Sequence, residues 1–250
     1  MWETPAYTNR VAFDQAEYDL RCEWGFPGLQ ALSPISDVAV IVDVLSFSTA
    51  VDVAVANGAS VLPYRWKDES AYDFVRTRGG LLASDRSGVY SLSPASLLSI
   101  PAATALVLPS PNGGALSLES RARTTFTACL RNCEAVAARV PRYGRTVAVI
   151  PAGEQWPDGA LRPGIEDWIG AGAVLAGLRG RRSLEAQLAV AAFERFRGDL
   201  KGVLTGCGSG KELMERGFAA DVALAAAYGA SRAVPILWGD RFVDESSLGP

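Results

Sequence analysis

Short runs of apolar, β-branched residues recur along the chain, separated by segments long enough to form helices. The strongest run covers residues 38–45 and is almost continuously apolar, as expected for a strand that is buried on both faces. Similar runs, which we interpret as further strands, lie at residues 60–63, 105–108, 146–150, 201–205 and 233–237.

Helical patterns lie between most of these runs. Residues 48–56 are small and apolar and end at Asn57-Gly58, a common stop signal, while Asn132 suits the cap of a helix over 132–140. Further helices are predicted at residues 166–178, 183–196, 211–216 and 219–228. Strands that alternate with helices indicate an α/β fold, and we predict three α/β/α layers around a largely parallel or mixed central sheet.

The chain shows no internal repeat and no low-complexity tract. We therefore treat residues 1–250 as a single domain, which leaves room for two lobes that share a cleft. Residues 153–164 are rich in Gly and Pro and are predicted to form a long loop, either a lid or a simple connection. The polar residues 240–250 are predicted to form a flexible tail.

Composition narrows the classes of function. The chain is 49% hydrophobic with a net charge of −3, which argues against disorder and against a basic nucleic-acid-binding surface. We find neither an apolar run long enough to span a bilayer nor a secretory signal pattern at the start. We expect a soluble, cytoplasmic protein with no nucleic-acid or membrane partner, and the sequence leaves homo-oligomerisation open.

The chain contains no histidine, which excludes Ser-His-Asp and Cys-His catalysis and most zinc sites. Any metal is expected to be a hard ion held by oxygen atoms, such as magnesium. Four cysteines are present without a CxxC pair, and we interpret them as reduced thiols.

Polar residues follow the strongest strand, where ligands of parallel sheets usually bind. Asp43 stands late in that strand, and the hydroxyls of Ser46, Ser48 and Thr49 open the next helix. The carboxylate suits the binding of a cation, and the hydroxyls at the start of the helix suit the binding of an anion. A purely structural interpretation, in which Asp43 caps the helix and the hydroxyls satisfy its first turn, fits the residue types equally well.

Three other segments carry candidate chemistry. Asn112 and Gly113 form a Gly-rich turn after a strand, which indicates either an anion-binding nest or a turn with positive φ. Glu166 and Asp167 lie at the start of a predicted helix. We interpret them either as magnesium ligands or a general base, or as acids that simply complement the helix dipole. The fourth segment contains Asp85-Arg86, a candidate pair for a metal and an oxyanion or an ordinary surface pair.

Taken in order, these segments resemble the 2-phosphosulpholactate phosphatase (ComB-type) family. The family patterns DVLRATS, ANGA, GERGG, GNSP, TTNGT, LNAxAVA, LEDxxAAGAI and SxxG…GxxxDV resemble the segments beginning at Asp43, Ala56, Ser84, Ser91, Ser110, Leu130, Ile165 and Ser209. The resemblance runs from about Asp37 to Leu237. The family's arginine in the first pattern is Ser46 here, and its glutamate in GERGG is Asp85.

The resemblance implies magnesium-dependent hydrolysis of a small anionic phosphomonoester, 2-phosphosulpholactate in the family, on the route to coenzyme M. It implies metal ligation by Asp43, Asp85, Glu166 and Asp167, and substrate binding by Ser46, Ser48, Thr49, Arg86, Asn112, Gly113, Arg131 and Asn132. The catalytic candidates are Asp43, Asp85 and Cys129; for covalent catalysis the sequence does not choose between Asp43 and Cys129. The alternative is a catalytically weak member that binds a phosphorylated or sulfonated metabolite.

Overall fold

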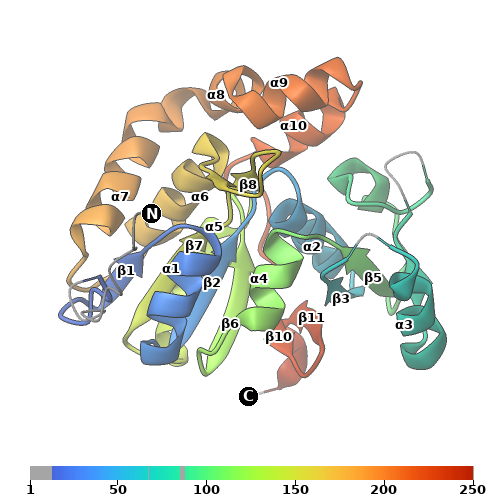
Figure 1. The fold of residues 1–250 in the computed structure, drawn as a ribbon, viewed down its shortest axis with the longest axis horizontal. Coiled ribbons are helices and arrows are strands. Elements are labelled where there is room, and N and C mark those ends of the chain that lie inside the picture. Colours follow the sequence, from blue (N-terminus) through green and yellow to red (C-terminus); the bar gives the residue numbers. More distant parts are fainter. Residues whose placement is uncertain (1–12, 67, 85–87, 250) are drawn as a thin grey trace, which may run out of the picture.

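A nine-stranded sheet organises the residues described by the computed structural model, which are 13–66, 68–84 and 88–249 (Figure 1). The order of the strands across the sheet is β1-β7-β2-β6-β10-β11-β3-β5-β4. In that order they span Leu20–Cys22, Val147–Pro151, Val38–Val42, Thr124–Ala128, Pro235–Trp238, Arg241–Asp244, Ser60–Tyr64, Ala105–Pro109 and Leu81–Leu82.

Two parallel blocks make up this sheet, and an antiparallel hairpin joins them. Strands β1, β7, β2 and β6 run parallel, as do β3, β5 and β4. The hairpin of β10 and β11 lies between the blocks and pairs with each through a single register position, Ile236 with Phe126 and Phe242 with Val61. The predicted mixed, largely parallel sheet is therefore confirmed.

Helices cover both faces of the first block. On one face lie α1 (Gly25–Leu32) and α4 (Gly113–Glu119); on the other lie α5 (Cys133–Arg139) and α6 (Ile165–Ala176), with α7 (Leu184–Phe196) packed against α6. Successive side chains of β2 point to opposite faces of the sheet. Val40 packs on the α5–α6 side and Ile41 on the α1–α4 side. The three-layer α/β/α prediction is confirmed.

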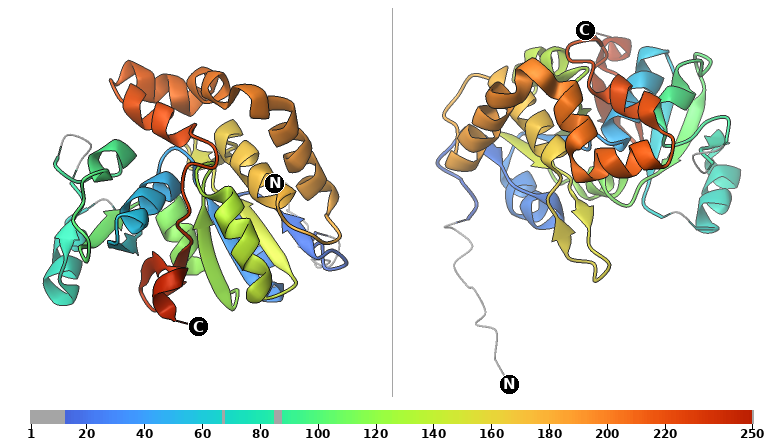
Figure 2. Two further views of the ribbon diagram at one scale, coloured as in Figure 1. Left: turned by 180° about the vertical axis from the view of Figure 1, so that it is seen from behind. Right: turned by 90° about the horizontal axis from the view of Figure 1, so that it is seen from above.

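The remaining helices lie along the β10–β11 hairpin and the second block or across the top of the sheet. Helix α2 (Phe47–Ala56) packs against β3, β6 and β11, and α3 (Ser70–Arg78) lies beside β4 and β5. Helices α8 (Leu200–Gly206), α9 (Gly208–Glu215) and α10 (Ala219–Ala225) form an arm across the top of the sheet, as Figures 1 and 2 show. No helix of the described chain is long and apolar enough to cross a membrane.

Three local predictions differ from the structure. Residues 201–205, predicted as a strand, lie in helix α8, because Asp199 caps the first turn and Leu200 and Leu204 bury one helical face. The prediction of a flexible tail over residues 240–250 is wrong for the part that forms β11. Phe242 of this strand is fully buried and packs edge-on against Phe47. Within 153–164, the chain forms a short hairpin of β8 (Glu154–Gln155) and β9 (Leu161–Arg162).

Candidate functional site

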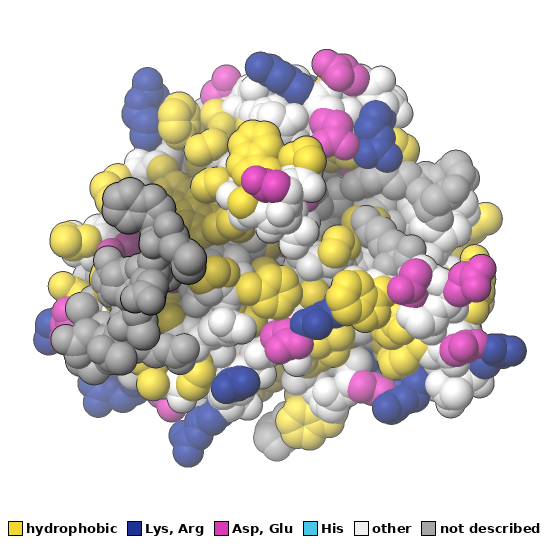
Figure 3. Space-filling view, viewed as in Figure 1, with side chains coloured by type: hydrophobic (Ala, Val, Ile, Leu, Met, Phe, Trp, Pro, Cys, Tyr) yellow, Lys and Arg dark blue, Asp and Glu magenta, His cyan; other side chains and the backbone are white. Residues whose placement is uncertain are grey.

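A cavity of about 890 Å³ opens where β2 and β5 end, bordered by the β8–β9 hairpin, α3 and α9. Figure 3 shows the face of Figure 1, which is recessed beside the central hairpin. The polar and charged side chains that line the cavity are Asp43, Ser46, Asp68, Glu69, Ser84, Ser110, Asn112, Glu154, Gln155, Arg162, Ser209, Glu212 and Arg216. Asp43, Ser46 and Asn112, three residues predicted from sequence, thus share one cavity.

Asp43 is the buried carboxylate of this cavity. Its Oδ1 accepts a hydrogen bond from the backbone N–H of Phe47 at 3.1 Å, and its Oδ2 accepts one from the backbone N–H of Gly113 at 2.9 Å. Burial, and then the nearby charge of Glu154, raise the pKa of Asp43 to about 6 despite these two donors. The result is a fixed carboxylate in a strongly negative environment.

Ser48 and Thr49 do not reach the cavity. The Ser48 hydroxyl accepts a hydrogen bond from the Asp43 backbone N–H at 2.8 Å and lies 2.7 Å from the Thr127 hydroxyl. The Thr49 hydroxyl donates to the carbonyl of Val44 at 2.7 Å, and both side chains are fully buried. In the structure they satisfy the polar backbone where β2 turns into α2, and their role in substrate binding stays a prediction.

Gly113 serves Asp43 rather than a ligand, because its backbone N–H already binds that carboxylate. A Cβ at Gly113 would lie 2.5 Å from Phe47 Cδ1 and 2.8 Å from Asp43 Oδ2, so only glycine permits this approach of α4 to β2. The neighbouring side chains of Ser110 and Asn112 line the cavity. The Gly-rich turn is thus part of the site. Its Gly113 backbone N–H holds Asp43, and the side chains of Ser110 and Asn112 face the cavity.

Asp167 and Glu166 lie behind Asp43. Asp167 accepts hydrogen bonds from the backbone N–H groups of Val44 at 2.7 Å and Gly153 at 2.9 Å, which ties α6 to the ends of β2 and β7. Burial, followed by the charges of Glu166 and Asp43, raises the pKa of Asp167 well above its ordinary range. Neither acid lines the cavity, whereas Asp43 does, and Asp85 of the predicted metal set lies outside the described residues.

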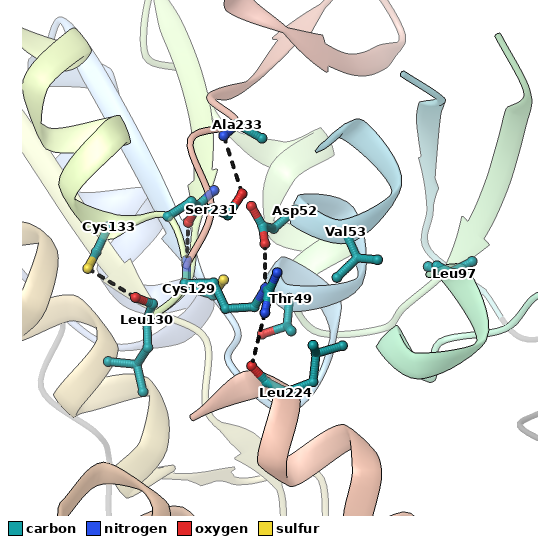
Figure 4. Close-up of polar contacts among 12 residues, drawn as sticks. Thr49, Asp52, Val53, Leu97, Cys129, Leu130, Cys133, Leu224, Ser231 and Ala233 are labelled. Atoms are coloured by element: carbon teal, nitrogen blue, oxygen red, sulfur yellow. Dashed lines mark hydrogen bonds and ion pairs between the residues drawn. The ribbon is translucent and has the colours of Figure 1, made fainter. Parts of the chain in front are cut away.

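Cys129, Arg131 and Asn132 belong to a separate buried network, part of which Figure 4 shows. The Arg131 guanidinium lies 2.7 Å from Asp52 Oδ2 and donates to the Leu224 carbonyl at 3.4 Å. Asn132 accepts a hydrogen bond from the Cys129 backbone N–H at 2.9 Å.

None of these three predicted residues lines the cavity. Burial raises the pKa of the Cys129 thiol, which keeps it protonated and unreactive. Tertiary contacts thus place Arg131, Asn132 and Cys129 outside the cavity, and their roles in substrate binding and as an alternative nucleophile stay predictions. Asp85 and Arg86 lie outside the described residues.

Sequence reasoning assigned no role to Glu154 and Arg162, which enter the cavity from the β8–β9 hairpin, to Ser209 and Glu212 of α9, or to Arg216 just after that helix. The only signal for the hairpin was the composition of residues 153–164, which indicates a functional loop without naming its residues. Within the described ranges, five carboxylates line the cavity against two guanidinium groups. No three acidic or thiol side chains of those ranges form a cluster able to hold a metal.

Comparison with known proteins gives one family. A family model described as 2-phosphosulpholactate phosphatase matches residues 27–240 of the 250. This range contains every described residue that lines the cavity and all strands of the two parallel blocks except β1. A comparison with curated proteins found no match.

Proposed function

The chain belongs to the 2-phosphosulpholactate phosphatase family of phosphoric monoester hydrolases, and from that premise we propose that it hydrolyses a small phosphomonoester in the cavity around Asp43. The supporting observation is the position of Asp43, a buried carboxylate that faces the cavity while two backbone N–H groups hold it in place. Such rigid placement suits a group that must meet a reacting phosphoryl centre. We propose 2-phosphosulpholactate as the substrate.

Magnesium is proposed as the metal, held by Asp43 and Glu154. The donor set fits, because both are carboxylates of the cavity and Glu154 is the neighbouring charge that most raises the pKa of Asp43. Among the described residues that line the cavity, five carboxylates outnumber two guanidinium groups, so added positive charge would favour binding of an anionic ester. Magnesium needs no cage of three protein acids, since it usually binds one or two carboxylates together with substrate phosphate. When bound, it would neutralise charge on the phosphoryl oxygens.

The residues of the chain would orient the ester and the attacking group. Overall, water adds to phosphorus, the bond from phosphorus to the ester oxygen breaks, and that oxygen leaves as the alcohol with a proton from water. Asn112 and Ser46 lie in the cavity wall and would donate hydrogen bonds to phosphate oxygens. Of the two candidate nucleophiles, Asp43 faces the cavity and Cys129 does not, so a covalent route would run through Asp43.

Phosphate release from a panel of phosphomonoesters, with and without magnesium, tests this proposal. We expect magnesium-dependent release that is fastest with 2-phosphosulpholactate and lost in Asp43→Asn. Asp73→Asn, which removes an exposed carboxylate on α3 that pairs with Arg76, is the matched control and should retain wild-type rates. No release from any ester, or unchanged release in Asp43→Asn, would overturn the proposal.

A further inference from the structure

Two described basic side chains line the cavity, and their surroundings differ. Arg216 lies 2.9 Å from Glu212 one helical turn away, so its charge already has a partner. Arg162 forms no ion pair with any described residue. A guanidinium without a carboxylate partner among the described residues is available for an anionic ligand.

Two contacts hold the Arg162 side chain in place, one with α9 and one with the turn of its own hairpin. Its Nη2 donates a hydrogen bond to the hydroxyl of Ser209 at 3.3 Å, and its guanidinium carbon lies 5.7 Å from the ring centroid of Trp156. Both partners are uncharged, and the Ser209 hydroxyl uses only one of the five N–H donors of the guanidinium. The group is thus positioned while most of its donors stay available.

Arg162 also lies at a suitable place relative to Asp43. In the β8–β9 hairpin it stands directly opposite Glu154, which lines the same cavity as Asp43. Opposed residues of an antiparallel pair have their Cβ atoms only about 5 Å apart. Arg162 and Glu154 therefore line the cavity from adjacent strands of one hairpin. Asp43 lines the same cavity, so one ligand bound there can contact both the carboxylate and the guanidinium.

We propose that Arg162 is a specificity-determining residue that binds a second anionic group of the substrate, a sulfonate or a carboxylate, while the phosphate lies at Asp43. This inference rests on the proposed phosphatase function and adds which residue of the cavity recognises an acidic group beside the phosphate ester. A guanidinium can bind two oxygens of either group at once. Ser209 is a positioning residue, since it acts through Arg162.

The test measures kcat and KM of wild type, Arg162→Gln and Arg162→Lys with four esters. These are 2-phosphosulpholactate, 2-phospholactate without the sulfonate, 2-sulfoethyl phosphate without the carboxylate, and isopropyl phosphate without either. For esters that carry the recognised group, Arg162→Gln should lower kcat/KM about 30-fold or more, mainly through KM. For isopropyl phosphate the change should stay below about threefold. The ester with one acidic group that loses more identifies the group bound.

Matched variants separate recognition from a general loss of structure. Arg162→Lys keeps the charge and should recover part of the affinity, while Arg123→Gln, at an exposed arginine outside the cavity that pairs with Asp37, should change KM by less than about threefold. Ser209→Ala should raise KM with a smaller effect than Arg162→Gln. An equal fall for all four esters, or no fall with any of them, would overturn the assignment.

A binding measurement keeps this inference separate from the phosphatase proposal. The affinity for sulpholactate, the dephosphorylated product, is measured by calorimetry with wild type and Arg162→Gln. We expect a dissociation constant about tenfold or more higher in the variant. If the wild type hydrolyses no ester but Arg162→Gln still weakens sulpholactate binding, the catalytic proposal fails and the assignment of Arg162 stands. If the two proteins bind sulpholactate equally, the assignment fails whatever the activity.

Discussion

The backbone N–H of Gly113 donates a hydrogen bond of 2.9 Å to Asp43 Oδ2, and this contact connects β2 of one parallel block to the helix that follows β5 of the other. Four strands, β6, β10, β11 and β3, lie between β2 and β5 in the sheet. The candidate site is therefore built where two separate parts of the chain meet, and its geometry depends on how closely α4 approaches β2.

Gly113→Ala tests that close approach. The added Cβ would come within 2.5 Å of Phe47 and 2.8 Å of Asp43, so α4 or the carboxylate must move. We expect a loss of about 1–3 kcal/mol in the free energy of unfolding and a fall in kcat of about tenfold or more, because small displacements at a reacting centre are costly. Urea unfolding and steady-state kinetics measure both effects. Gly198→Ala, where a Cβ meets nothing within 4 Å, should change neither.

Magnesium binding should depend on pH through Asp43. In the metal-free fold, burial and the charge of Glu154 raise the pKa of Asp43 from 3.8 to about 6, so the folded state binds its proton more tightly than the unfolded chain. Its contribution to stability is thus complete below pH 4 and is lost as the pH rises to about 6, at a total cost of about 3 kcal/mol. Magnesium competes with this proton, so it should stabilise the fold little at pH 5 and strongly at pH 7.5.

Thermal unfolding with chelator and with magnesium measures this difference. The magnesium-induced rise in Tm should grow between pH 5 and pH 7.5 in the wild type and shrink in Asp43→Asn and Glu154→Gln. Asp73→Asn serves again as the surface control. A magnesium effect of equal size in all four proteins would place the ion elsewhere.

Cys129→Ala should leave catalysis intact. The thiol is fully buried outside the cavity, and burial raises its pKa, so it has no access to substrate. We expect kcat within about threefold of wild type and a loss of about 1 kcal/mol in stability from the small space left in the core. A variant that folds normally yet has lost all turnover would restore Cys129 as a nucleophile.

Arg131→Met should affect stability and not substrate affinity. The change leaves Asp52, fully buried at the other end of the 2.7 Å ion pair, without its cation. We expect a loss of about 3–5 kcal/mol in the free energy of unfolding, partly recovered in the double variant Arg131→Met/Asp52→Asn. KM should stay within about threefold of wild type. A tenfold rise in KM with unchanged stability would contradict the structural role.

The sequence alone predicted those features of the protein that depend on residues close together in the chain. The apolar run before Asp43 predicts a buried strand, and a carboxylate at its end is costly enough to demand partners. The Gly-rich turn at Asn112 and Gly113 follows from the same kind of local signal. The order of these motifs indicated the family that residues 27–240 match, and the alternation of strands and helices indicated the layers.

The tertiary structure decided which polar residues face the cavity. Arg131 and Arg162 are chemically identical, but packing of α10 and α2 encloses Arg131 with Asp52, while the β8–β9 hairpin presents Arg162 to the cavity. The hydroxyls of Ser48 and Thr49 likewise turn to backbone groups nearby. Helical and strand periodicities fix only the neighbours within an element. Contacts between residues tens of positions apart arise from how elements pack, so a single sequence does not reveal them.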